Sequence, residues 1–81
     1  MPADQEPQTL ADAHEVLWRT RPNRDAHPSK WAAFYRHRAQ VYAATAKIDL
    51  RHRHEATQCA GLEMRKALDI EHRLSSQGDG A

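Results

Sequence analysis

The residues with the most chemical potential are crowded into the segment 49–55, which reads DLRHRHE. Asp49 and His52 are three residues apart, a spacing that on a helix places a carboxylate beside an imidazole. Such side chains bind Fe, Zn or Mn, and helical bundles that hold two metal ions use carboxylate-x-x-His pairs on facing helices. The further carboxylates that a metal ion needs would come from Glu15 on the first helix or from Glu63 of a second copy.

A structural interpretation competes with the metal site. Arginine and acidic side chains three and four residues apart in this segment can form salt bridges along a solvated helix turn. We favour the salt bridges, because Asp49-x-x-His52 is the shortest form of the di-metal pattern and those bundles usually use Glu. No cofactor is therefore expected, and a transition metal is bound only under the alternative interpretation.

Nucleophilic catalysis is poorly supported. Cys59 is the only thiol in the chain, and His52 or His54 would have to serve as its base. His52 lies two turns away on the same helix, beyond the hydrogen-bonding distance at which a thiol and a base act together. We therefore predict no catalytic residues and do not expect an enzyme. A single cysteine cannot form a disulfide within the chain, which favours a reducing, cytoplasmic setting.

Charge is distributed unevenly along the chain. Residues 28–54 hold six bases and one acid, a net charge of +5, whereas residues 1–27 and 55–81 each hold five acids and three bases, a net charge of −2. A basic block can follow a phosphate backbone, so nucleic-acid binding through residues 30–53 is one hypothesis. We favour pairing of the block with the acidic half of a partner helix, because the bases are spread around the expected helix and no known nucleic-acid-binding motif accompanies them.

Helices must position all of these groups, since the chain has few β-branched or aromatic residues and strands are poorly supported. Thr9 can cap a helix in which apolar residues from Leu10 to Leu17 recur at helical spacing, and this predicts a first helix over about 9–20. The next segment, 21–28, contains two prolines and is predicted to be a loop.

The rest of the chain is predicted to form one very long helix over about 29–76. This stretch contains no proline and Gly61 is its only glycine, so we expect about 45 helical residues with a length of roughly 70 Å. The alternative is a break near residues 51–55 that folds the chain into a three-helix bundle, but no Gly or Pro stands there to make the turn. The flanking segments 1–8 and 77–81 are predicted to be disordered.

The apolar pattern of the long helix predicts a partner. Its first half is apolar on nearly all sides, which is typical of a helix buried on more than one side. We expect the first helix on one side and a helix of a second copy on another, antiparallel because of the opposite charges. The residues expected to hold this assembly are Trp31, Phe34, Val41, Tyr42, Ile48 and Leu50. Its polar centre would consist of Arg51, His52, Arg53 and His54.

Length and composition limit the function. The chain has 81 residues, 40% of them apolar, and 14 of these apolar residues are Ala. Such a chain buries little surface alone and is marginally stable as a single copy. No apolar stretch is long enough to span a membrane. We predict an all-α helical hairpin with a short first and a very long second helix, paired as an antiparallel dimeric bundle. It would act as a small cytoplasmic adaptor or regulatory protein through self-association and helix-mediated partner binding.

Overall fold

The computed structural model describes residues 7–79, and this part of the chain is helical with no strand. Helix α1 spans Leu10–Arg19, α2 spans Pro28–Ile48 and α3 spans Arg53–Asp79. One turn of 3₁₀ helix, Leu50–His52 (η1), stands between α2 and α3. The prediction of an all-helical fold is confirmed. None of the helices within the described part combines the length and the apolar composition needed to cross a bilayer.

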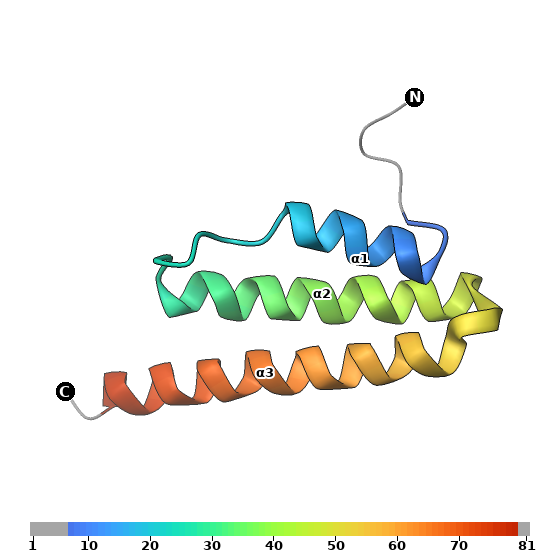
Figure 1. Cartoon of the computed structure of the whole chain (residues 1–81). Helices are drawn as coiled ribbons and strands as arrows, with labels where there is room; N and C mark the ends of the chain where they lie inside the picture. Colours follow the sequence, from blue (N-terminus) through green and yellow to red (C-terminus); the bar gives the residue numbers. More distant parts are fainter. Residues whose placement is uncertain (1–6, 80–81) are drawn as a thin grey trace.

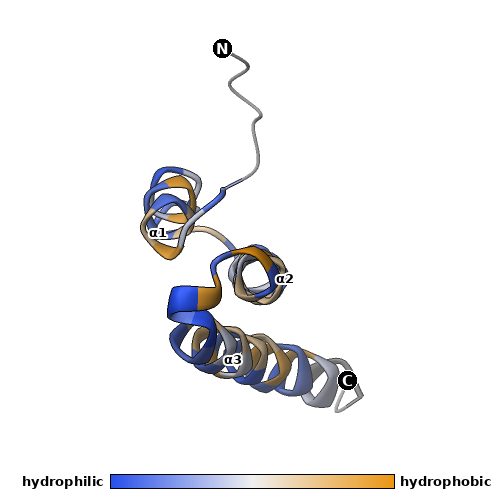
Figure 2. Cartoon of the chain, turned by 90° about the vertical axis from the view of Figure 1, so that its right-hand side faces the viewer, coloured by the Kyte–Doolittle hydropathy of each residue, from blue (hydrophilic) through white to orange (hydrophobic). Residues whose placement is uncertain are grey.

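Helix α2 is the centre of the molecule. The three helices run side by side, α3 antiparallel to α2 along nearly its whole length and α1 over the half of α2 nearer the corner (Figure 1). Seen down the helix axes, α1 and α3 lie against different sides of α2 (Figure 2). The apolar residues on many sides of α2 are explained by this arrangement, because α2 is covered twice by its own chain.

The prediction of one continuous helix over 29–76 is wrong. The chain leaves α2 at Asp49, which has φ −97° and ψ 78°, and it turns back through η1 into α3. No residue in the described part has a positive φ, so the corner needs no glycine. Aspartate favours helix ends over helix interiors because its side chain competes for backbone hydrogen bonds. Helix α2 therefore does not need a second copy to cover the side on which α3 lies, since α3 covers it within one chain.

The charge pattern predicted an antiparallel pairing between two copies, and the structure shows an antiparallel pairing of α2 with α3 within one chain. The pairing between copies stays a prediction. Arg36 on α2 forms an ion pair with Glu71 on α3 at 2.6 Å, and Arg38 pairs with Glu63 at 2.9 Å. The basic middle of the chain therefore meets its acidic C-terminal third as the charges suggested.

The core is thin and rich in alanine. The buried apolar residues among 7–79 are Leu10, Ala13, Leu17, Ala32, Phe34, Ala39, Tyr42, Ala46, Ala56 and Ala67. Six of these ten are Ala, and the largest of the fully buried side chains are Tyr42 and Leu17. Leu17 and Tyr42 belong to one cluster in which α1 meets the half of α2 next to the corner.

The predicted ends of the chain fall largely outside the described residues. Of the first flank, 1–6 are not described, and Pro7 and Gln8 precede the cap of α1. Of the second flank, 77–79 belong to α3, and 80–81 are not described.

Thr9 caps α1 as the sequence predicts, because its Oγ1 accepts a hydrogen bond from the backbone N–H of Asp12 at 3.1 Å. Replacing Thr9 with Ala should lower the free energy of unfolding by about 1 kcal/mol. Urea denaturation followed by circular dichroism measures the change. The exposed Gln58 on α3 provides the control, and Gln58→Ala should change stability by less than about 0.5 kcal/mol. Equal effects of the two substitutions would contradict a capping role.

Candidate functional site

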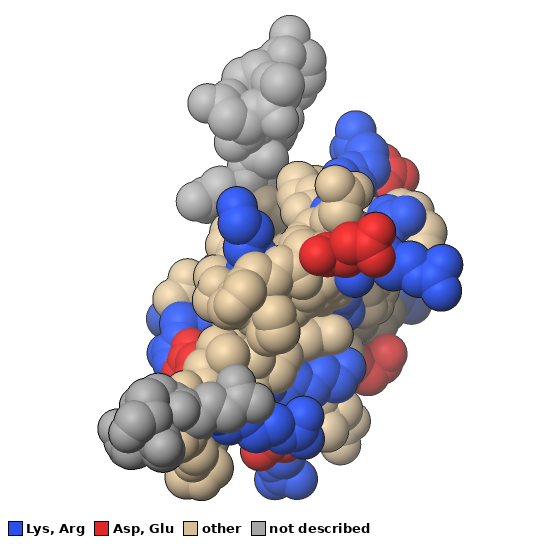
Figure 3. Space-filling model, turned by 90° about the vertical axis from the view of Figure 1, so that its left-hand side faces the viewer, with Lys and Arg blue, Asp and Glu red and all other residues tan. Residues whose placement is uncertain are grey.

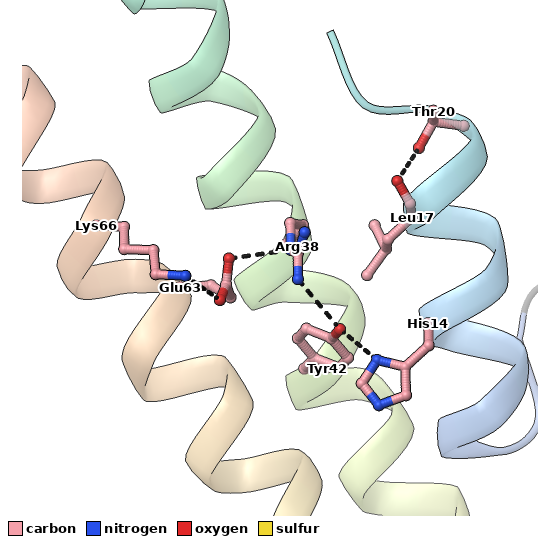
Figure 4. Close-up of polar contacts among 7 residues, drawn as sticks. All are labelled: His14, Leu17, Thr20, Arg38, Tyr42, Glu63 and Lys66. Carbon is pink, nitrogen blue, oxygen red and sulfur yellow. Dashed lines mark hydrogen bonds and ion pairs between the residues drawn. The ribbon is translucent and has the colours of Figure 1, made fainter. Parts of the chain in front are cut away.

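A chain of polar contacts crosses all three helices (Figure 4). On α1, Nδ1 of His14 lies 2.7 Å from the hydroxyl of Tyr42 on α2. The guanidinium of Arg38 reaches the same hydroxyl at 3.5 Å and the carboxylate of Glu63 on α3 at 2.9 Å. Lys66, one turn further along α3, contacts the other carboxylate oxygen of Glu63 at 3.1 Å. We call these five residues the polar network.

The inner members of the polar network are buried. Tyr42 is 1% exposed and Glu63 is 5% exposed. A buried carboxylate is costly unless a cation compensates it, and Arg38 and Lys66 supply two. The Nε–H of Arg38 is not aligned for a hydrogen bond to Glu63 Oε1, so the contact between these two atoms is an ion pair. The polar network therefore fixes how α2 and α3 face each other.

Neither the Tyr42 hydroxyl of the polar network nor the nearby Cys59 thiol is activated as a nucleophile. Burial raises the pKa of the Tyr42 phenol above its ordinary value. Burial, with a contribution from the Glu63 carboxylate, also raises the pKa of the Cys59 thiol. Because the thiolate is the nucleophilic form of cysteine, a raised pKa makes Cys59 less reactive at neutral pH.

A second polar site stands at the corner between α2 and α3. The carboxylate of Asp49 accepts a hydrogen bond from the backbone N–H of Leu10 at 2.9 Å and contacts Nδ1 of His52 at 3.0 Å. The bond from Leu10, followed by that from His52, lowers the pKa of Asp49. One carboxylate thus joins the N-terminus of α1, where negative charge is favourable, to the turn that reverses the chain.

The lowered pKa of Asp49 predicts how stability depends on pH. A carboxyl group with a lowered pKa in the folded state stabilises the protein fully above its unfolded pKa, and this contribution is lost as the pH falls through the folded pKa. Asp49→Asn should therefore destabilise the protein at pH 7 and reduce the loss of stability on acidification to pH 3. Urea midpoints at several pH values measure this, and Asp69→Asn controls for the removed charge. A parallel fall in both variants would contradict the prediction.

The third interhelix contact is the pair formed by Arg36 and Glu71. Nε and Nη2 of the guanidinium donate to the two carboxylate oxygens at 3.1 and 2.6 Å. The hydrogen bond raises the pKa of Arg36 and lowers that of Glu71. Both side chains remain about two-fifths exposed, so this pair mainly sets the register between the start of α2 and the end of α3.

The residues of the metal hypothesis are only partly brought together. Asp49 and His52 are in contact, as their spacing predicts. Glu15 lies exposed on α1 beside Arg19 at 3.3 Å, and Glu63 belongs to the polar network. Among residues 7–79 no group of three or more His, Cys, Asp and Glu side chains is arranged to hold a metal ion. The metal site stays a prediction that a single copy does not assemble.

The residues predicted to hold a dimer divide into two groups. Phe34 and Tyr42 are buried inside the chain, whereas Ile48 is 52% exposed and Leu50 is 68% exposed. Trp31 and Val41 are half-buried. Of the predicted polar centre, His52 is half-buried, and Arg51, Arg53 and His54 are exposed around the corner.

The basic block offers less free positive charge than the sequence suggests. Arg36 and Arg38, two of its six bases, are engaged by carboxylates of α3. At the end of the molecule that carries the loop between α1 and α2, basic and acidic side chains are interspersed (Figure 3). Nucleic-acid binding stays a prediction, and its exposed bases are Lys30, Lys47, Arg51 and Arg53.

Reasoning from the sequence missed the polar network. Arg38 and Tyr42 are four residues apart and therefore share a helix face, which was a usable signal. Glu63 was considered only as a further carboxylate ligand for a metal ion, and its observed partners are Arg38 on α2 and Lys66 on α3. Comparisons with protein families, curated proteins and solved structures find no match to this chain.

Proposed function

We propose that this protein is a small, non-catalytic interaction protein that works as a self-associated helical unit. The proposal rests on where the apolar side chains lie: the core consists mainly of small ones, and several large ones lie on the surface. Six of the ten buried apolar residues are Ala, whereas the large side chains Trp18, Ile48, Leu50, Leu62 and Leu68 are each more than half exposed. Burial of such a Leu or Ile contributes roughly 1.5–3 kcal/mol, and in one copy most of this is not realised.

Self-association supplies the missing burial. A domain of this size is marginally stable alone, and each large apolar residue covered by a second copy stabilises the assembly. Near the corner, Ala43, Ala46 and Ala60 line a shallow groove with Leu50 at the same site. Small residues let another helix approach closely, so this groove supports helix-mediated contact.

Catalysis is not part of the proposal. The pKa of Cys59 is raised, and the polar network and the pair Arg36–Glu71 join charges that compensate each other. These contacts position helices and do not present a reactive group. The single cysteine supports a reducing, cytoplasmic setting, and a role as an adaptor or regulatory subunit follows from binding without turnover.

Concentration-dependent unfolding tests the proposal. If the folded state is a dimer, its melting temperature rises with protein concentration, because mass action favours the associated form. We expect a continuous rise between about 2 and 200 µM, with a mass corresponding to two chains at the upper end. A melting temperature that does not change over this range, together with the mass of one chain, would reject self-association.

A further inference from the structure

We propose that two copies of this chain associate by exchanging α3. In the exchanged dimer the corner straightens, α2 and α3 merge into one helix, and α3 of each copy packs on α2 of the other. This inference rests on the proposed self-association and specifies one way in which the copies join. Because exchange re-forms the α2–α3 contacts of the closed chain, it does not itself cover Trp18, Leu62 or Leu68, and other observations support it. It is carried by the spacing of the inward-facing residues, the backbone at the corner and the contacts between the two helices.

The inward-facing residues keep one spacing across the corner. One stripe of buried or half-buried residues comprises Ala32, Tyr35, Ala39, Tyr42 and Ala46 on α2 and Ala56, Ala60, Glu63, Ala67, Ile70 and Leu74 on α3. The buried Phe34 and Thr45 of α2 do not belong to it. Successive members are alternately three and four residues apart, the repeat of a helix that packs along one stripe. Asp49 and Arg53 continue the alternation between Ala46 and Ala56. A straight helix would therefore present a single continuous stripe with no shift of face.

The backbone at the corner is close to helical. Only Asp49, with ψ 78°, is far from helical values, and Arg53 already has φ −58° and ψ −45°. Between them η1 is a 3₁₀ turn, whose dihedral angles differ little from those of an α-helix. The corner contains neither Gly nor Pro. Straightening thus changes the backbone mainly at one residue.

The contacts that Arg38 and Tyr35 make with α3 can form equally well between two copies. Arg38 with Glu63 and Tyr35 with Lys66 are antiparallel contacts whose members lie nearly the same number of residues before and after Arg51. An exchanged dimer preserves these contacts, with Arg51 near its two-fold axis. Exchange of an identical element is a low-cost route to a dimer for this reason. The pair Arg36–Glu71, whose members lie 15 residues before and 20 residues after Arg51, is offset from this register.

The exchanged dimer also gains a contact that the closed chain lacks. When the antiparallel register is continued to the axis, Asp49 of one copy lies opposite Arg53 of the other, and the two-fold symmetry forms this pair twice. In the closed chain Arg53 is exposed, and Asp49 is bound to Leu10 N–H and His52. The new carboxylate–guanidinium pairs offset the loss of those bonds.

A proline at the corner separates the closed and exchanged forms. Leu50→Pro should leave the hairpin folded, because Leu50 is the first residue of the turn after Asp49 and proline is tolerated at that position. In a straight helix the same proline would clash with the carbonyl of Ala46. We expect Leu50→Pro to weaken dimerisation by at least about tenfold, and Leu50→Ala, which removes the same side chain, to weaken it by less than about threefold. Equal dimerisation of wild type and Leu50→Pro would overturn the exchange.

Charge reversal tests the new contact with a matched control. Arg53→Asp would place two carboxylates opposite each other at the axis, and it should weaken dimerisation by at least about tenfold. Arg51→Asp makes the same change in net charge on a side that faces away from the stripe, so its effect should be several-fold smaller. Equal effects of the two variants would contradict the Asp49–Arg53 pairing.

Disulfide trapping between two differently substituted chains gives the final test. Ala46 and Ala56 belong to the same buried cluster, so in a Cys59→Ser background we would refold a chain with Ala46→Cys together with one carrying Ala56→Cys and oxidise the mixture. Exchange predicts a disulfide-linked heterodimer, whereas a chain with Ala44→Cys on the outer surface of α2 should give none with Ala56→Cys. Dimers by mass without the 46–56 crosslink would overturn the exchange alone, and a monomeric mixture would overturn the proposed self-association as well.

Discussion

Replacing Arg38 with Ala is expected to destabilise the protein by about 3 kcal/mol, because the buried Glu63 carboxylate would keep only the half-exposed Lys66 as a compensating cation. Glu63 is only 5% exposed, so water can compensate little of its charge. The loss is measured as the change in free energy of unfolding in urea, with all variants at one protein concentration because association contributes to stability.

Two controls separate the buried charge from general damage. Lys66 contacts the same carboxylate, but its side chain is 54% exposed, so Lys66→Ala should lower stability by less than about 1 kcal/mol. The double substitution Arg38→Met and Glu63→Met should recover most of the loss, because well-packed apolar residues can replace a buried ion pair at little expense. A double variant less stable than Arg38→Ala would contradict this expectation, because the ion pair would then stabilise the fold more than an apolar pair does.

Leu17→Ala is expected to cost about 3 kcal/mol, since truncation of a fully buried Leu removes its apolar burial and leaves a cavity. Leu17 is 1% exposed and is the largest aliphatic side chain with no contact to water. The same urea experiment on Leu68→Ala, at a residue that is 51% exposed, should show a loss below about 1 kcal/mol. Similar losses at both positions would contradict the assignment of the core to the interface of α1 with α2.

The elements whose signals are local could be predicted from the sequence. Thr9 caps α1 because a side-chain oxygen at that position satisfies a free backbone N–H. The prolines at 22 and 28 delimit the loop, and Pro28 occupies the first turn of α2, where its missing N–H does no harm. These features depend on a few neighbouring residues and not on the path of the rest of the chain.

The corner could not be predicted by looking for glycine or proline. Those residues mark turns with a positive φ or a fixed one, and this corner uses neither. The signal that was available is Asp49, an aspartate at the end of α2, whose carboxylate caps the start of α1 through Leu10. Its partner is distant in the sequence, so the preference for a corner over a helix is decided by tertiary contact.

The candidate site was predictable only where its contacts lie within one helix turn. The spacing of Asp49 and His52 predicted their contact, and it is observed at 3.0 Å. The pair of Arg38 and Glu63 joins two helices, and its formation depends on where the chain reverses. Once the corner is known, the antiparallel register brings these residues together, which shows why an error at one residue removed the polar network from the prediction.

Sedimentation equilibrium of the purified chain between about 5 and 200 µM tests the central claim, self-association of a marginally stable helical unit, most directly. We expect a reversible shift from the mass of one chain, 9.3 kDa, to that of two as concentration increases. A compact, fully folded species that keeps the mass of one chain at every concentration would contradict it.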